Sequence, residues 1–395
     1  MKKIALVNQR YGLEVNGGSE YYTRLIAERL TEQFKVEVIT TKALDYTTWE
    51  NYYTADEEYI HGVCVKRFPV TCQRAKDFGA YNGKYLDYAK TYGYNIEKEK
   101  IWFEKQGPYC PKAIEYIKNN RDNYDVFIFV TYLYYLTVMG MPEVAEKSIL
   151  IPTAHEEPYI HFKTYETLFH LPKAFIFLTE EEKKLVHGLF RCNDIPYEIM
   201  GVGIDIPCEP NVEIFRKHEN IQEDYIIYVG RIDEGKGCPV LFRYFIEYKK
   251  QHPENDLKLV LMGKQVCDVP NHKDIICLGF VSEEEKFSGI AGAKALVLPS
   301  AFESLSISVL EAMAISVPVI VNGTCDVLKG HCLRSNAGLY YTNYFEFEGI
   351  LDWLFSHTTE YRQMCKNAKQ YVKRNFQWDV IIGKFKGIIN WICEC

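Results

Sequence analysis

Short apolar runs alternate with longer segments of helical period along this chain, and the alternation occurs twice. The runs expected to be strands cover residues 4–7, 36–40, 126–130, 148–151 and 174–178 in the first half, and 225–229, 257–262, 275–278, 295–298 and 317–321 in the second. Helical segments such as 240–250 separate them. Strands joined through helices pair in parallel, because each helix returns the chain to the starting edge of the sheet. The sequence therefore predicts an α/β protein with two doubly wound units.

The junction between the two units is predicted where glycine and proline interrupt the pattern. Gly201, Gly203 and Pro207 lie there, just before a polar stretch that ends at Asp224. The chain has 395 residues, a length that fits two domains of ordinary size. We expect an N-terminal domain over residues 1–205, which holds an aromatic and charged insertion, and a C-terminal domain over 206–375.

Composition and charge exclude several classes of protein. Hydrophobic residues make up 47% of the chain and charged residues 25%, so the chain is neither disordered nor fibrous. The net charge of -7 argues against a general affinity for nucleic acid. The 13 cysteines include no Cys-x-x-Cys pair, which argues against structural zinc and against a disulfide framework.

Two apolar segments bear on the cellular location of the protein. The run at 4–7 is too short for a signal peptide, so we expect a cytoplasmic protein with reduced thiols. Residues 126–142 carry no charge, but their polar positions favour a buried strand and a short helix over a membrane span.

The first candidate site is a glycine loop after the opening strand. Gly12, Gly17 and Gly18 precede a helix that is expected to begin with Ser19 as its N-cap. Glycines let the backbone approach a ligand closely, and the helix N-terminus offers free N–H groups to an anion. The loop lacks the G-x-G-x-x-G spacing, and no acidic residue ends the second strand. A nicotinamide dehydrogenase is therefore a poor interpretation.

The second candidate site follows the first strand of the second unit. Residues 230–236 match the P-loop pattern G-x-x-x-x-G-K, but Gly237 stands where Ser or Thr must hold magnesium. An ATPase is therefore excluded. The loop still presents two cations, Arg231 and Lys236, which suit a diphosphate unless they are ordinary surface charges.

The third candidate site follows the strand at 295–298. We expect a helix to begin near Ser304, so that residues 304–306 expose unpaired N–H groups to a phosphate. Ser304, Ser308 and Glu311 would then share one face of that helix. Carboxylates accept hydrogen bonds from sugar hydroxyls, so Glu311 suits a ribose and Glu303 a transferred sugar. The alternative is that Glu303 caps the helix and Glu311 is solvated.

In this order and spacing, the motifs resemble those of the retaining glycosyltransferases of family 4. The resemblance spans nearly the whole chain and includes the Gly17-Gly18 loop, the His-bearing segment 152–156 and the closing Phe376-Gln377-Trp378. It implies a GT-B fold, in which two Rossmann-like domains face each other across a cleft. It also implies that the C-terminal helix, 376–395, crosses back onto the first domain.

The resemblance assigns roles to individual residues. Arg231 and Lys236 would bind the donor diphosphate and Glu311 the ribose, while His155 would approach the sugar from the other domain. The remaining donor-binding residues would be Gly17, Gly18, Glu303, Ser304, Leu305 and Ser306. The sequence departs from the family in having Ser-Leu-Ser at 304–306 where Gly-Phe-Gly is frequent, and Glu156 where Asp is common. The other histidines are interpreted as surface or core residues.

The implied function is transfer of a hexose, with retention, from a nucleotide-sugar donor to a glycan or lipid-linked acceptor in surface polysaccharide biosynthesis. No Asp-x-Asp motif lies near the proposed site, so we expect the two cations to replace a metal, and we expect no cofactor. Residues 66–76 carry four basic and no acidic side chains. They are interpreted as a solvated loop or as a patch for peripheral contact with the inner face of a membrane.

Two alternatives to this function stay open at the level of sequence. The first is a non-catalytic protein that binds nucleotide sugars on the same fold, because fold does not imply function. The second is a GT-B epimerase or phosphorylase.

Overall fold

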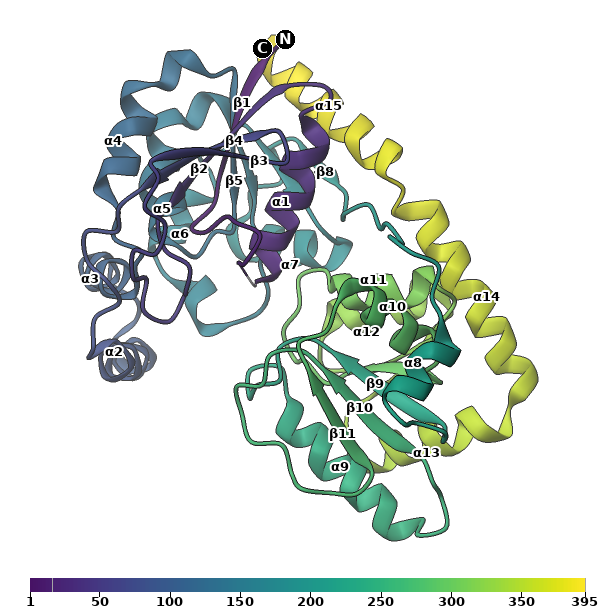
Figure 1. Cartoon of the computed structure of the whole chain (residues 1–395). Helices are drawn as coiled ribbons and strands as arrows, with labels where there is room; N and C mark the ends of the chain where they lie inside the picture. Colours follow the sequence, from purple (N-terminus) through teal and green to yellow (C-terminus); the bar gives the residue numbers. More distant parts are fainter. Residues whose placement is uncertain (16, 395) are drawn as a thin grey trace. The chain divides into compact units, whose positions relative to one another are not determined.

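A computed structural model describes residues 1–15 and 17–394, so Asn16 in the glycine loop and Cys395 lie outside the described residues. The chain divides into two compact units (Figure 1). Unit 1 consists of Met1–Val202 and the chain from Asp379 onward, and unit 2 consists of Gly203–Trp378. Each unit is built on its own sheet.

The sheet of unit 1 has eight strands in the order β3-β4-β2-β1-β5-β6-β7-β8, all parallel except for the β3–β4 hairpin. The strands are β1 (Lys3–Val7), β2 (Lys35–Thr41), β3 (Glu57–Ile60), β4 (Val63–Phe68), β5 (Val126–Val130), β6 (Ser148–Ile151), β7 (Ala174–Phe177) and β8 (Tyr197–Ile199). The α-helices are α1 (Gly18–Leu30), α2 (Phe78–Tyr92), α3 (Ile96–Gln106), α4 (Pro111–Asn119), α5 (Tyr135–Gly140), α6 (Thr164–Leu168), α7 (Glu180–Phe190) and α15 (Trp378–Glu394).

The central strands of unit 1 are buried on both faces, which is why they read as continuous apolar runs. Every residue of β5, Val-Phe-Ile-Phe-Val, is buried, and the short helix α5 follows it. This confirms the prediction of a buried strand and a helix at 126–142. Among the described residues, no helix is long and apolar enough to cross a bilayer.

Only part of the basic stretch 66–76 is a loop, because residues 66–68 belong to β4. Lys66 and Arg67 lie in β4, and both are paired with acidic residues of the neighbouring strand β3: Lys66 with Glu57 at 2.5 Å, and Arg67 with Glu58 at 2.6 Å. Arg67 is 1% exposed. The hairpin partner thus neutralises these two charges within the unit, and that part of the stretch offers no free cations to a membrane.

The sheet of unit 2 has six parallel strands in the order β11-β10-β9-β12-β13-β14. They are β9 (Tyr225–Val229), β10 (Lys258–Met262), β11 (Ile275–Gly279), β12 (Ala295–Leu298), β13 (Val319–Asn322) and β14 (Gly338–Tyr341). The helices are α8 (Val212–His218), α9 (Cys238–Gln251), α10 (Glu283–Ala291), α11 (Ile307–Ala314), α12 (Asp326–Ser335), α13 (Tyr344–Ser356) and α14 (Thr358–Asn375). Two doubly wound sheets confirm the predicted fold class.

Candidate functional site

The strand order of unit 2 reverses between β9 and β12. From β9 the chain adds β10 and β11 on one side of the sheet, and β12, β13 and β14 then extend it on the other side. Loops that leave the carboxyl ends of two such strands run in opposite directions and leave room for a ligand. Arg231 and Lys236 follow β9, and Glu303 follows β12, so the fold brings these predicted site residues to one place.

Glycine lets the loops at this edge pack closely. Gly237 has φ 75°, and a Cβ there would lie 2.6 Å from the carbonyl oxygen of Pro299, just after β12. Gly263, just after β10, has φ 137°, and a Cβ there would lie 1.9 Å from the carbonyl oxygen of Gly230. Gly237 and Gly263 therefore allow close contact between loops, in a conformation that other residues rarely adopt.

The charged side chains of these loops are paired with one another. Lys236 Nζ donates to Glu303 Oε1 at 2.6 Å across the two loops. Arg231 Nε contacts Asp233 Oδ2, and Asp233 Oδ1 accepts from the backbone N–H of Lys236 at 2.7 Å. The Arg231 and Lys236 side chains stay 38% and 32% exposed, so an anion can reach them. Asp233, which the sequence analysis did not single out, fixes both ends of the loop.

The helix after β12 begins later than predicted. Helix α11 starts at Ile307 with Ser306 as N-cap, because Ser306 has φ 65°, a left-handed conformation that does not continue a helix. Ser304 therefore precedes the helix and does not share a helical face with Ser308 and Glu311. The Ser306 hydroxyl is buried, and no described residue forms a hydrogen bond with it. A buried hydroxyl at a helix N-terminus is suited to an anion.

A buried histidine supports the segment that leads into α11. His331 Nε2 donates to the carbonyl of Leu305 at 2.9 Å, and Nδ1 accepts from the Tyr371 hydroxyl at 2.9 Å. Burial lowers the pKa of His331 to about 4, so the ring is neutral. From sequence alone His331 is interpreted as a core or surface histidine, because its partners lie in distant segments.

Glu311 is buried rather than solvated. It is 6% exposed, and its Oε1 accepts from Lys286 Nζ, in α10, at 2.9 Å. Burial raises the pKa of the Glu311 carboxyl, and the Lys286 charge opposes that effect. Lys286 lies 25 positions away in sequence, and no local pattern pointed to it.

The helix that follows the glycine loop of unit 1 does not begin where the sequence predicts. Helix α1 begins at Gly18 with Gly17 as N-cap, so Ser19 is not the cap. The Ser19 hydroxyl instead donates to Glu20 at 2.9 Å, and Glu20 forms a buried ion pair with Arg10 at 2.6 Å. A Cβ on Gly17 would lie 2.2 Å from Glu20 Oε2, so glycine leaves room for this pair. Donor binding by Gly17 and Gly18 stays a prediction.

His155 follows β6 in unit 1, and a strained, hydrogen-bonded backbone precedes it. Thr153 has φ 52°, and the N–H of Ala154 donates to Glu182 Oε1 at 2.7 Å. Burial raises the pKa of Glu182 to about 8. His155 Nε2 lies 3.5 Å from Glu157 Oε2, whereas Glu156 pairs with His161. Contact between His155 and a donor sugar stays a prediction.

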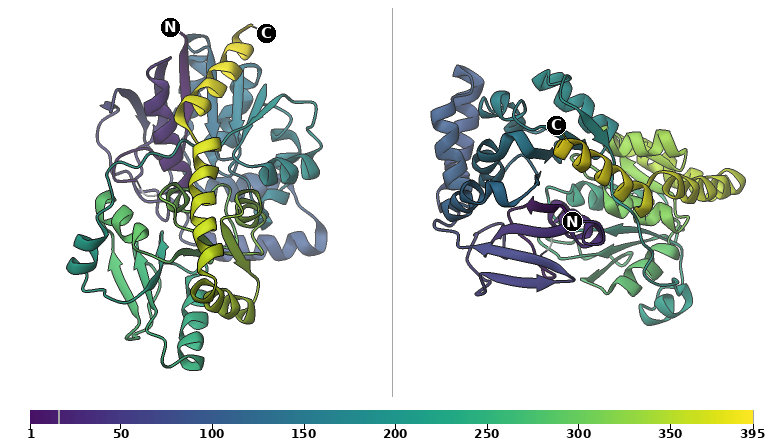
Figure 2. Two further views of the ribbon diagram at one scale, coloured as in Figure 1. Left: turned by 90° about the vertical axis from the view of Figure 1, so that its right-hand side faces the viewer. Right: turned by 90° about the horizontal axis from the view of Figure 1, so that it is seen from above.

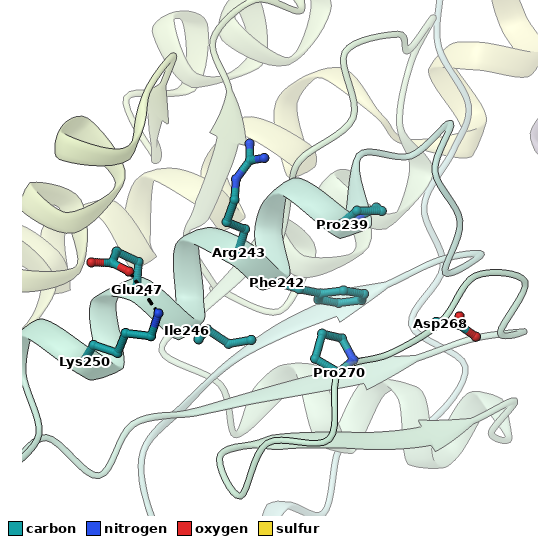
Figure 3. Close-up of a pocket in the computed structure, with 8 residues that line it drawn as sticks. All are labelled: Pro239, Phe242, Arg243, Ile246, Glu247, Lys250, Asp268 and Pro270. Carbon is teal, nitrogen blue, oxygen red and sulfur yellow. Dashed lines mark hydrogen bonds and ion pairs between the residues drawn. The ribbon is translucent and has the colours of Figure 1, made fainter.

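Two other features of unit 2 contain none of the predicted site residues. A cavity of about 360 Å³ lies against α9 (Figure 3). It is lined by Pro239, Phe242, Arg243, Ile246, Glu247, Lys250, Asp268 and Pro270. Among the described residues, one cluster has the geometry for a metal ion, formed by His218, Glu219 and Glu285. Glu285 already caps α10 through Ser282, which accounts for its position.

Comparisons with known proteins give a family match over part of the chain and a fold match over nearly all of it. Residues 211–371 match the family Glycosyl transferases group 1. An uncharacterized glycosyltransferase of Methanocaldococcus jannaschii is 27% identical over 223 residues, which are 52% of this chain and 53% of that protein. The chain thus spans about half the length of this curated relative.

Solved structures resemble the whole chain. Anabaena HepE, in complex with UDP and glucose, is 14% identical with a TM-score of 0.71, and the match covers 99% of this chain and 100% of HepE. WaaG, a glycosyltransferase involved in lipopolysaccharide biosynthesis, is 15% identical with a TM-score of 0.67, and the match covers 98% and 99%. At these identities the likeness establishes the fold.

Proposed function

Because residues 211–371 form a glycosyl transferases group 1 domain and the chain has the GT-B fold, we propose that this protein is a retaining glycosyltransferase of family 4. It moves a hexose from a nucleoside-diphosphate donor to a hydroxyl of a glycan or lipid-linked acceptor. The observation that carries the proposal is the 2.6 Å pair between Lys236 and Glu303, where β9 and β12 end side by side.

The diphosphate of the donor binds to the loop after β9 and to the N-terminus of α11. Arg231, oriented by Asp233, donates two parallel hydrogen bonds to phosphate oxygens, and Lys236 supplies a second positive charge. The Ser306 hydroxyl and the first N–H groups of α11 complete the anion site. This set of donors explains why a chain without the P-loop Ser or Thr still binds phosphate.

Donor binding exchanges the partner of Lys236. When a phosphate binds the ammonium group of Lys236, Glu303 loses its ion pair. The Glu303 oxygens can then accept hydrogen bonds from sugar hydroxyls. The sugar and the phosphate therefore bind together, because each releases one partner of the pair. Glu303 touches the transferred sugar in this arrangement and is a catalytic residue.

Charge builds on the diphosphate as the bond between the anomeric carbon and the phosphate oxygen breaks. Arg231, Lys236 and the α11 N-terminus stabilise this leaving group, as preorganised positive charge does in other phosphate-releasing reactions. The acceptor hydroxyl attacks from the leaving-group face, its oxygen bonds to the anomeric carbon, and its proton passes to a phosphate oxygen of the departing nucleotide. The configuration is retained, and no protein base is required.

The donor class is a nucleoside-diphosphate sugar, and HepE, a protein of the same fold, binds UDP and glucose. WaaG acts in lipopolysaccharide biosynthesis, which favours a surface glycan or glycolipid as the acceptor class. We place the reaction in the cytoplasm, where nucleotide sugars are substrates, at the inner face of the membrane when the acceptor is lipid-linked. Lys66 and Arg67 are paired with Glu57 and Glu58, so these two residues give no support to membrane docking.

The test is a screen of UDP-, GDP- and ADP-sugars by thermal shift, followed by measurement of nucleotide release with E303Q. A bound donor raises the unfolding temperature of wild-type protein by mass action. E303Q lowers turnover by about 100-fold while the Kd of the nucleotide changes by less than about threefold. Glu247, an exposed partner of Lys250 on α9, provides the control variant E247Q, which leaves both quantities unchanged.

Three results would contradict the proposal. If no nucleotide sugar shifts the unfolding temperature, the assignment of a donor-binding site to these residues is wrong. If wild-type protein binds a donor but releases no nucleotide, the protein is a binder; if E303Q releases nucleotide as fast as wild type, catalysis does not depend on Glu303. The same assay in EDTA tests the metal-independent step: turnover persists when Arg231 and Lys236 carry the charge, and a strict need for added metal contradicts that role.

A further inference from the structure

Helix α10 places a lysine against the most deeply buried carboxylate of the proposed site. Lys286 Nζ lies 2.9 Å from Glu311 Oε1, and the two side chains are 13% and 8% exposed. Among the described residues, Lys286 is the hydrogen-bond partner of Glu311, so Oε2 stays available to a ligand. The pair joins α10 to α11 close to the carboxyl edge of the sheet.

A carboxyl group at this depth needs a cation to stay charged. Burial disfavours the ionised form, and Glu283, an exposed residue of α10, adds negative charge because it lies 2.8 Å from the same ammonium group. Helix α14 also packs against α11, and it buries Met364, Ala368 and Val372. The adjoining strands β12 and β13 carry no titratable side chain. Lys286 is therefore the charge that opposes desolvation of Glu311.

The protonation state of Glu311 decides what it can bind. An ionised carboxylate only accepts hydrogen bonds and can take both vicinal hydroxyls of a ribose, whereas a protonated carboxyl is itself a donor. Hydrogen bonds to a charged acceptor are also the stronger ones. The charged form of Glu311 therefore binds ribose hydroxyls more strongly than the protonated form.

We propose that Lys286 is a positioning residue for the nucleotide: it holds Glu311 ionised, with Oε2 directed to the ribose hydroxyls, and so sets the preference for a ribonucleotide over a deoxyribonucleotide. This inference rests on the proposed function. Lys286 itself touches neither the phosphate nor the sugar, and its effect reaches the ligand through Glu311.

The experiment compares the Kd of a nucleoside diphosphate with that of its 2′-deoxy analogue by calorimetry. The nucleoside diphosphate is whichever of UDP, GDP and ADP binds wild-type protein. In K286M the Kd of the ribonucleotide rises about tenfold or more, while the Kd of the 2′-deoxy analogue changes by less than about twofold. The preference for ribose therefore collapses. K286R keeps a cation beside Glu311 and retains most of the preference.

Two further arms separate positioning from a structural role. In K286M the ribose preference returns as the pH is raised from about 6 to about 9, because higher pH deprotonates a carboxyl whose pKa burial has raised. K250M removes a lysine from the exposed Lys250–Glu247 pair and leaves both Kd values unchanged. If K286M does not fold, K286Q keeps a hydrogen-bond donor without the charge and gives the same loss and the same recovery.

Each remaining outcome overturns a specific statement. Equal losses of affinity for the ribonucleotide and the 2′-deoxy analogue in K286M show a structural or phosphate-binding role and overturn the inference alone. An unchanged preference in K286M overturns it as well. If wild-type protein binds none of the three nucleoside diphosphates, the proposed function fails and the inference fails with it.

Discussion

The charged residues of this site already form ion pairs with residues of opposite charge inside the protein. Lys236 is paired with Glu303, Arg231 with Asp233 and Lys286 with Glu311. Pairing keeps the partly buried charges compatible with folding, because an unpaired buried charge costs several kcal/mol. It also means that a ligand anion competes with a carboxylate for each exposed cation, which favours ligands that offer both phosphate and hydroxyl groups.

His331 gives a prediction at the residue scale. Its pKa of about 4 lies below the ordinary value of 6.5, so the folded state binds the proton less readily than the unfolded state. The stability that the neutral ring contributes is present above pH 6.5 and is lost as the pH falls toward 4. H331Q loses about 1–3 kcal/mol of unfolding free energy at pH 7, and its deficit relative to wild type shrinks near pH 4.5.

Denaturant unfolding of both proteins between those pH values measures the difference. The control is H357Q, because His357 is an exposed residue at the end of α13. A deficit in H331Q that stays constant with pH would contradict the assignment of a neutral, buried imidazole. His331 and Lys286 could not be found from sequence because their partners, Leu305 and Glu311, are far away in the chain and only the fold brings them together. Asp233 differs, because it contacts Arg231 and Lys236 within its own loop.

At the scale of elements, apolar runs located most of the central strands, whereas the edge strands β3 and β8 and the largely buried strand β4 were not predicted. Strands β1, β5 and β12 are buried and match the predicted runs closely. Strand β3 alternates between exposed and half-buried residues at the sheet edge, and β8 has three residues with none fully buried. Edge strands lack a second covering layer, so their sequences carry little hydrophobic signal.

The start of α11 shows the same limit for helices. Helix-forming residues surround Ser304–Ser306 in sequence, but the left-handed Ser306 delays the helix to Ile307. The preceding carbonyl, of Leu305, accepts a hydrogen bond from His331 in α12, a segment distant in sequence. Local propensity does not contain this information, so the helix start was predicted too early.

The contact between the loops after β9 and β12 gives a prediction at the element scale. G237A places a methyl group 2.6 Å from the Pro299 carbonyl and requires φ 75° of a residue that disfavours it. The variant is expected to lose about 1–3 kcal/mol of stability and to separate Lys236 from Glu303, which raises the KM for the donor.

Gly235 in the same loop provides the matched control. A Cβ there would meet Asp233 Oδ1 at 3.5 Å, an ordinary contact, and Gly235 has no positive φ. Thermal unfolding and donor KM are measured for G235A and G237A in parallel. Equal effects of the two variants would show that loop composition, rather than the close approach to Pro299, determines the geometry.

On the scale of the whole molecule, the chain returns to its first unit at its end. Helix α15 buries Ile381, Phe385, Ile388, Ile389 and Ile392. Lys2 Nζ donates to Asn390 Oδ1 at 2.9 Å, and Lys384 Nζ donates to the Ile199 carbonyl at 2.7 Å, so both ends of the chain meet in unit 1 (Figure 2). Unit 1 therefore includes helix α15, although most of its residues precede unit 2.

This topology predicts which unit a substitution in α15 weakens. Phe385 is fully buried, and F385A removes its ring and leaves a cavity, which costs about 3–5 kcal/mol. Because α15 packs within unit 1, hydrogen exchange should accelerate in β1 and β5, whereas β9 and β12 of unit 2 keep the wild-type rates. K386A, at the exposed position next to Phe385, leaves both sets of rates unchanged. Faster exchange in β9 and β12 of F385A would mean that the two units unfold as one cooperative body, so that the stability of the donor site depends on the last helix of the chain.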